Sequence, residues 1–200
     1  MEQKVGPDHG NPDGSGRLLE EKSAHPFMEQ LLAAVDEEGT RGTRLIEDAR
    51  RLWLRVQKLL SMNLLAPEAD REALHWACCA VQLPFRLVRG PASGRLGQIS
   101  LRDRCEQAAE LLIGAASGRL DEKLLDRTTR LLHETPQKAP MIDESRLLAD
   151  AVNLDDFGVI GVIQSTLLIA RQGGGVRSVS EACQKRQQYG YWEARLKESF

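Results

Sequence analysis

The sequence predicts an all-α fold, organised as a single compact bundle of seven to eight helices. Apolar residues recur at every third or fourth position through most of the chain, which is the spacing of one helix face. The alternation of apolar and polar residues that is typical of a strand never persists beyond a few positions. No Asn-Gly or Asp-Gly pair separates two apolar runs, so the usual signal of a β-hairpin is missing as well.

The composition is that of one folded domain preceded by a polar tail. Of the 200 residues, 42% are hydrophobic and 28% are charged, which is ordinary for globular proteins. Residues 1–16 are rich in Gly, Pro, Asp and Asn and predict a disordered tail, so we expect the helical domain to span residues 17–200. The 27 Lys and Arg residues nearly balance the 29 Asp and Glu residues, and the net charge is −2. Because no global positive field results, we expect neither a nucleic-acid partner nor a membrane partner.

The cysteines and the apolar stretches favour a cytoplasmic protein. The chain has four cysteines, Cys78, Cys79, Cys105 and Cys183. Their spacing matches no zinc ribbon, no CxxC redox pair and no disulfide framework, which fits a reducing compartment. The apolar stretch 157–170 is interrupted by glycines and polar residues and is shorter than the roughly 20 residues of a membrane-spanning helix. The first residues lack the apolar core of a signal peptide.

Three helices are predicted before Pro84. Residues 27–35 carry apolar residues at helical spacing and form the first. Residues 45–60 form the second, with one apolar stripe over about four turns. Its charged residues face away from that stripe: Arg44, Asp48, Arg51, Arg55 and Lys58. Pro67 suits the first turn of the third helix, which Pro84 ends.

A long loop is predicted over residues 85–98, because glycines and a proline interrupt it and neither period persists. Three arginines in this loop are candidates for binding an anionic ligand: Arg86, Arg89 and Arg95. Arg102 follows just after the loop.

Residues whose side chains can cap a helix mark the predicted starts of the next two helices. Ser100 followed by Asp103 predicts a capped helix over residues 101–112, which Gly114 and Gly118 break. Asp121 can cap the following helix, because its carboxylate can accept from the unpaired amides of the first turn.

Three further helices complete the predicted bundle. Asp143 can cap the first of them. Asp155 is expected to accept backbone hydrogen bonds at a corner before Gly158, after which an apolar helix follows. A final polar helix is expected from about Glu181, with Trp192 on one face.

The segment 141–163 carries the most informative pattern. It resembles the late motif of the HD-domain phosphohydrolases, which are helical metal-dependent hydrolases, at these residues: Glu144, Leu147, Leu148, Asp150, Ala151, Leu154, Asp155, Phe157 and Gly158. His133 lies where this family places a histidine before the motif. The resemblance extends over about residues 27–200 and implies a helical fold around a metal site.

The residues at the family's ligand positions depart from its pattern. The resemblance implies divalent cations held by a histidine, an adjacent His-Asp pair and a distant aspartate, because these side chains bind the metal that activates water. Here the first histidine falls near Leu52 and the final aspartate on Val152. The His-Asp pair falls on Cys78-Cys79 in one register and on Val81-Gln82 in another. Leu and Val cannot coordinate a cation, so we expect no metal and no other cofactor, and a site filled in as core.

Three hypotheses about function follow. The first is a catalytically degenerate HD-like protein with a non-enzymatic binding or regulatory role, whose partner is a protein or a small anionic ligand. The alternative is a metal-dependent phosphohydrolase acting on a nucleotide or phosphate ester, with a divalent metal held by the atypical pocket residues Cys78, Cys79, His133 and Asp150. A further alternative is an unrelated helical interaction module. His133 itself either contacts an anionic ligand or bonds the last carbonyls of its helix. The sequence does not predict the oligomeric state.

Overall fold

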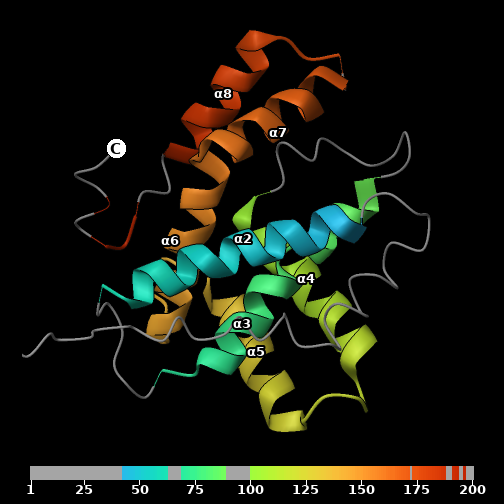
Figure 1. The fold of residues 1–200 in the computed structure, drawn as a ribbon, viewed down its shortest axis with the longest axis vertical. Coiled ribbons are helices and arrows are strands. Elements are labelled where there is room, and N and C mark those ends of the chain that lie inside the picture. Colours follow the sequence, from blue (N-terminus) through green and yellow to red (C-terminus); the bar gives the residue numbers. More distant parts are fainter. Residues whose placement is uncertain are drawn as a thin grey trace, which may run out of the picture.

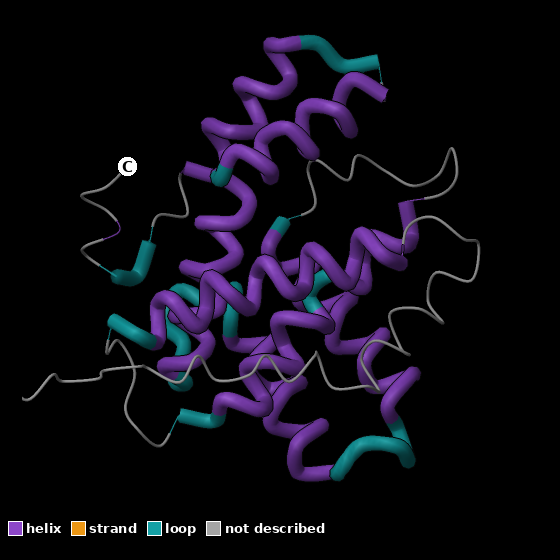
Figure 2. Tube along the Cα trace, in the orientation of Figure 1, coloured by secondary structure: helices purple, strands orange, loops and turns teal. Residues whose placement is uncertain are grey.

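Seven α-helices and one short 3₁₀ helix make up most of what the computed structural model describes, namely residues 42–62, 69–88, 100–171, 173–187, 191–193 and 196. These ranges contain no strand (Figure 1, Figure 2). The elements in chain order are α2 (Gly42–Leu60), α3 (Arg71–Ala80), η1 (Leu83–Val88), α4 (Leu101–Ala116), α5 (Glu122–Glu134), α6 (Asp143–Phe157), α7 (Val159–Arg171) and α8 (Val176–Gln187). The predicted all-α bundle is confirmed for this part of the chain.

The body of the bundle consists of α2 to α6. Helix α2 packs against α3 and α6, while α5 packs against α3, α4 and α6. Each of the five helices contributes a fully buried leucine to one shared core: Leu52, Leu74, Leu112, Leu131 and Leu148. Burying one such side chain stabilises the fold by about 1.5–3 kcal/mol relative to leaving it exposed. The helices of the body therefore depend on one another for their stability.

Helices α7 and α8 form a hairpin that extends from the C-terminal end of α6, away from the body of the bundle (Figure 1). Helix α7 packs on α6, and α8 packs on α7. Gly173, in the turn between them, has a φ of 79°, in the left-handed region that favours glycine. None of the described helices combines the length and the apolar character that a bilayer crossing requires.

Two of the predicted caps are confirmed. Ser100 Oγ accepts the N–H of Asp103 at 3.1 Å at the start of α4. Asp121 Oδ2 accepts the N–H of Leu124 at 3.1 Å at the start of α5. Each side chain satisfies a first-turn amide that has no partner inside its helix.

The prediction that Asp143 caps its helix is wrong. Helix α6 begins at Asp143 itself, and the preceding Ile142 makes no side-chain cap bond. Glu134, at the end of α5, accepts the N–H groups of Met141 and Ile142 at 2.7 and 2.9 Å through Oε2. A side chain from the preceding helix thus binds the two amides that come just before α6.

Two helix boundaries also differ from the predictions. Helix α4 continues through Gly114 and ends before Gly118, whose φ is 73°. The last described helix, α8, begins at Val176 rather than near Glu181, and Trp192 lies in a bend beyond it. Several predicted features lie outside the described residues: the tail 1–16, the helix 27–35, Pro67, Arg89 and Arg95. Arg86 falls within η1, and its side chain lies outside the described part of the chain.

Candidate functional site

The positions that match the family's metal ligands lie inside the core of the bundle. Leu52 on α2, Cys78 and Cys79 on α3 and Val152 on α6 are each at most 1% exposed and belong to one hydrophobic cluster. The three helices contact one another. The cluster to which the four positions belong consists of apolar and thiol side chains and is shared by α2 to α6.

The second register of the missing His-Asp pair supplies no ligand pair either. Val81 is fully buried in the same cluster. The Gln82 side chain is buried, and its Oε1 accepts from Arg104 Nη2 at 3.2 Å. The amide nitrogen of Gln82 has no hydrogen-bond partner. This position therefore carries a buried amide that is held by an arginine.

The two adjacent thiols are held in their protonated form. Burial raises the pKa of Cys79 to about 12. Burial, together with the neighbouring Cys79, raises the pKa of Cys78 well above its ordinary value. Because the thiolate is the form that attacks substrates and binds metals, neither thiol is prepared for either task at neutral pH.

The donor set does not fit a divalent cation. In the described ranges no group of three or more His, Cys, Asp or Glu side chains is arranged to hold a metal ion. Leu52 and Val152 have no donor atoms, and His133 lies on the exposed side of α5 rather than in the core. These positions therefore lack the set of ligands that the resemblance implies.

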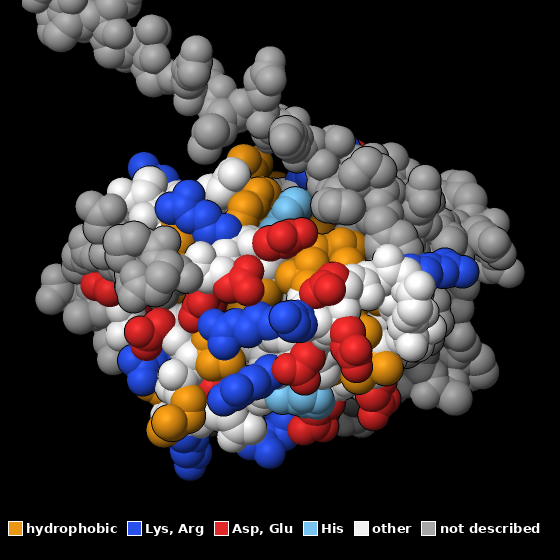
Figure 3. Space-filling view, turned by 90° about the horizontal axis from the view of Figure 1, so that it is seen from below, with side chains coloured by type: hydrophobic (Ala, Val, Ile, Leu, Met, Phe, Trp, Pro, Cys, Tyr) orange, Lys and Arg blue, Asp and Glu red, His pale blue; other side chains and the backbone are white. Residues whose placement is uncertain are grey.

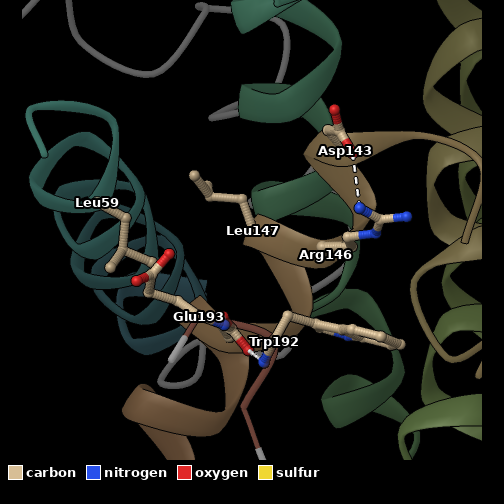
Figure 4. A pocket seen from close by; sticks show the side chains of 7 residues that line it. Leu59, Asp143, Arg146, Leu147, Trp192 and Glu193 are labelled. Atoms are coloured by element: carbon tan, nitrogen blue, oxygen red, sulfur yellow. Dashed lines mark hydrogen bonds and ion pairs between the residues drawn. The ribbon is translucent and has the colours of Figure 1, made fainter. Parts of the chain in front are cut away.

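Asp150 is buried against the C-terminal segment. Asp150 is 3% exposed, and its two side-chain oxygens accept the N–H groups of Trp192 and Glu193 at 2.7 and 2.8 Å. A cleft of about 270 Å³ lies beside this contact (Figure 4). Arg146 lines the cleft, where it pairs with Asp143 at 3.0 Å and lies 5.8 Å from the ring centroid of Trp192. Asp150 thus anchors residues 192–193 to α6.

Asp155 binds arginine side chains, so the expectation that it accepts backbone hydrogen bonds is wrong. Arg51 donates from Nε and Nη2 to its two oxygens, both at 2.7 Å, and Arg55 donates from Nε at 2.8 Å. Burial alone would raise the pKa of Asp155, but the hydrogen bonds and charges of the two arginines hold it below its ordinary value. A Cβ on Gly158 would lie 3.0 Å from the carbonyl oxygen of Leu154 and 2.8 Å from Arg55 Nη2, so a larger residue here would crowd the backbone of α6 and the arginine that binds Asp155.

Arg104 is a buried charged residue that the sequence pattern did not predict. Its guanidinium donates to the carbonyl of Val81 at 2.9 Å, pairs with Asp156 at 3.4 Å and lies 4.4 Å from the ring centroid of Phe85. It thereby joins α4 to the end of α3, to η1 and to α6. The one sequence feature that indicates its burial is its position three residues after Leu101, which places it on the apolar face of α4.

His133 lines an open groove of about 730 Å³ between the start of α4, α5 and the segment that follows it. Arg102, Arg130 and Lys138 add three positive charges to this groove, and Asp126 and Glu134 add two negative ones. Glu134 is occupied by two backbone amides and by Arg130 at 3.4 Å. The side chains of Arg102, His133 and Lys138 have no polar partner among the described residues.

The described surface around these helices mixes both signs of charge. Figure 3 shows basic and acidic side chains interspersed on the face seen from below, without a large patch of one sign. Of the sequence-predicted anion-binding arginines, none is placed with a described side chain. Arg102, which follows the predicted loop 85–98, lines the same groove as His133.

The comparisons with known proteins give no match: no protein-family model fits the chain, and no curated protein and no solved structure is significantly similar to it.

Proposed function

We propose that this chain is a non-catalytic binding protein, built on an HD-like helical scaffold whose metal-binding positions have become part of the core. The observation that carries this proposal is the shared burial of Leu52, Cys78, Cys79 and Val152 in one apolar cluster. An aspartate or histidine kept there without a metal would be an unpaired buried polar group, which is costly. Replacement by apolar side chains removes that cost and removes the chemistry with it.

Metal analysis of the purified full-length chain tests the absence of a catalytic centre. After exposure to Mn, Fe, Zn, Mg or Ni salts and exhaustive dialysis, we expect substoichiometric metal. We also expect no metal-stimulated hydrolysis of phosphomonoesters, phosphodiesters or nucleotides. Stoichiometric metal, or a metal-dependent hydrolysis that His133→Ala abolishes, would overturn the proposal in favour of a phosphohydrolase with atypical ligands.

The ligand class that the geometry favours is a small anion, bound in the groove beside His133. Arg102 and Lys138 carry positive charges without an ion-pair partner among the described side chains, while Glu134 is already occupied. The groove volume of about 730 Å³ lies within the range of roughly 300–1,000 Å³ that is typical of ligand sites. His133 adds a ring N–H group that can donate to an anion.

Calorimetric titration with inorganic phosphate and pyrophosphate tests the groove. Arg102→Gln removes one charge-assisted hydrogen bond, so we expect the Kd to rise about tenfold, which corresponds to about 1.4 kcal/mol. Arg119→Gln, an exposed arginine beyond the end of α4, is the matched control and should leave the Kd unchanged. Equal weakening by both variants, or no heat in the parent chain, would remove the groove as an anion site.

A further inference from the structure

The groove beside His133 has room for more than a small inorganic anion. Its volume of about 730 Å³ compares with the roughly 30 Å³ that one water molecule occupies in the liquid. An ion of a few atoms at the basic side chains would leave most of the groove filled with water. The residues that line the rest of the groove therefore indicate which further chemical group a ligand carries.

The segment that follows α5 gives this groove an apolar wall. Ala139, Pro140 and Met141 line the groove one after another. Met141 is 85% exposed, and Ala139 is exposed as well. A single exposed apolar residue needs no explanation, but consecutive ones at the edge of a groove form a local apolar surface. The methionine side chain is unbranched and polarisable, so it adapts to apolar groups of different shapes.

Hydrogen bonds hold the apolar wall in place. Glu134 Oε2 accepts the N–H of Met141 at 2.7 Å and the N–H of Ile142 at 2.9 Å. Arg146 Nη2 donates to the carbonyl of Pro140 at 3.1 Å. Because the backbone is bound on both sides of the Met141 side chain, a ligand that packs there orders little additional main chain. A wall that is formed in advance is typical of small-molecule sites.

The basic side chains and the apolar wall lie at the same end of the groove. Glu134, which binds the Met141 amide, directly follows His133 in the sequence, and Lys138 directly precedes the wall. Asp126 lies seven residues before His133, which is about 10 Å back along α5. An anion beside His133 and Lys138 is therefore close to Met141 and separated from the Asp126 carboxylate.

The C-terminal end of α5 has its carbonyl groups occupied, which favours an anion nearby. Free carbonyl groups at this end of a helix repel negative charge. Gln137 donates to the carbonyl of His133 through Nε2 at 3.2 Å and to the carbonyl of Glu134 through its N–H at 3.0 Å. The carbonyl of Leu131 accepts both the N–H and the hydroxyl group of Thr135. These donors reduce the negative charge at the end of the helix.

We propose that the groove binds an amphiphilic anion, in which a phosphate or carboxylate group is joined to a compact apolar group. The anionic group lies at Arg102, His133 and Lys138, and the apolar group packs on Met141. This inference rests on the proposed function, because it uses the same anion site and adds the apolar part of the ligand. The contact with Met141 favours organic over inorganic anions, since only an organic ligand removes apolar surface from water.

Calorimetric titration of the full chain with inorganic phosphate and with phenyl phosphate tests the apolar contact. We expect the Kd of phenyl phosphate to be about tenfold lower than that of inorganic phosphate. In Met141→Ser this difference should disappear, while the Kd of inorganic phosphate stays the same. Leu54→Ser is the matched control, since Leu54 is an exposed leucine on α2, outside the groove, and its variant should leave both values unchanged.

Phenylacetate identifies the anionic group. A Kd similar to that of phenyl phosphate would support the inference with a carboxylate as an accepted anionic group. A Kd at least tenfold higher would support it with phosphate alone.

The outcomes separate this inference from the proposed function. If Arg102→Gln weakens the binding of inorganic phosphate but the phenyl group adds no affinity, the amphiphilic ligand is excluded and the anion site stands. No heat with any of the three compounds would overturn both. A phenyl group whose advantage survives Met141→Ser would overturn the inference as well, because the apolar contact would then lie elsewhere.

Discussion

Asp155 is a buried carboxylate whose partners lie far away in the sequence. Arg51 and Arg55, on α2, bind it from 104 and 100 residues before it. Such a pair is stable only when the desolvated charges are well matched in geometry, and removing one partner leaves the other uncompensated. The three side chains together hold the end of α6 against α2.

Replacing this carboxylate should destabilise the protein. For Asp155→Asn we expect the free energy of unfolding to fall by about 2–3 kcal/mol, because two partly buried guanidinium groups lose their counter-charge. Urea unfolding at pH 7 measures the change. Asp126→Asn, an exposed aspartate without a polar partner among the described residues, should change the stability by less than about 0.5 kcal/mol. Equal effects of both substitutions would contradict the role given to the arginines.

The Asp155 carboxylate also makes the free energy of unfolding depend on pH. Burial works to raise the pKa values of Asp155 and Glu144, but hydrogen bonds and nearby arginines lower both below their ordinary values. A lowered pKa in the folded state adds stability that is present above the ordinary pKa and is lost as the pH falls through the folded value. We expect the free energy of unfolding to decrease below about pH 5. The decrease should be smaller in Asp155→Asn, and an identical pH profile would exclude Asp155 as its source.

At the residue scale, the sequence singled out Asp155 as a structural residue but did not reveal that Arg51 and Arg55 bind it. Helical periodicity placed Asp48, Arg51 and Arg55 on the face away from the apolar stripe, which is correct. It could not show that this face meets α6 and α7, because a period of 3.6 describes one helix and contains no information about its neighbours. Arg104 was missed for the related reason that a charge on an apolar face is meaningful only once its acceptors are known.

The junction between α6 and α7 depends on a close approach of backbones. Gly161, in the first turn of α7, is buried, and a Cβ added there would lie 2.2 Å from the carbonyl oxygen of Asp155 and 2.6 Å from that of Asp156. These atoms belong to the backbone of α6 and cannot move aside as a flexible side chain could. The angle between the two helices is therefore set by the absence of a side chain.

A methyl group at this junction should open it. We expect Gly161→Ala to lower the free energy of unfolding by about 1–3 kcal/mol, the usual cost of overpacking. Gly114→Ala is the matched control, since Gly114 lies inside α4 with open space around its Cβ position and should gain about 0.5–1 kcal/mol from helix propensity. Thermal and urea unfolding of both variants give the comparison. A stabilised Gly161→Ala would refute the close approach.

Helices with a clear apolar period were predictable at the element scale, and their ends were not. Caps made by the local side chains of Ser100 and Asp121 were found, because capping residues act within one turn. Asp143 was mistaken for a cap because α6 begins at Asp143 itself, and the two amides before the helix are bound by Glu134 of α5. The start of α8 was placed too late, since residues 176–180 contain serines and valines, which are weak helix formers.

The core of the whole bundle encloses three thiols. Cys78, Cys79 and Cys105 are at most 1% exposed, and burial raises the pKa values of Cys79 and Cys105 to about 12. A reagent can reach a fully buried thiol only when the surrounding structure opens. Their reactivity therefore measures the cooperativity of the molecule as a whole.

These thiols should react only from the globally unfolded state, at a rate proportional to the equilibrium population of that state. With a disulfide exchange reagent at neutral pH, peptide-level mass spectrometry should show Cys78, Cys79 and Cys105 labelled together. In Asp155→Asn their labelling should accelerate about 30- to 160-fold, the equivalent of the expected 2–3 kcal/mol. Fast labelling of Cys78 alone in the parent chain would instead indicate a locally open pocket and would revive a reactive role for this residue.

The candidate site shows what one sequence can and cannot specify at the scale of the molecule. The resemblance singled out Leu52, Cys78, Cys79 and Val152, which the fold brings into one cluster. It also grouped Asp150 and His133 with them, and the structure separates these two into a C-terminal anchor and an exposed groove. Spacing along the chain fixed the helix that carries each residue, while the direction of each side chain depended on packing that the sequence alone does not show.

The anchoring of residues 192–193 by Asp150 orders events during synthesis. Asp150 leaves the ribosome 42 residues before Trp192, whose amide it binds. Until that segment has been translated, the carboxylate has neither of the two amides that pay for its burial. That flank of the bundle therefore gains these two hydrogen bonds only after residues 192–193 have emerged.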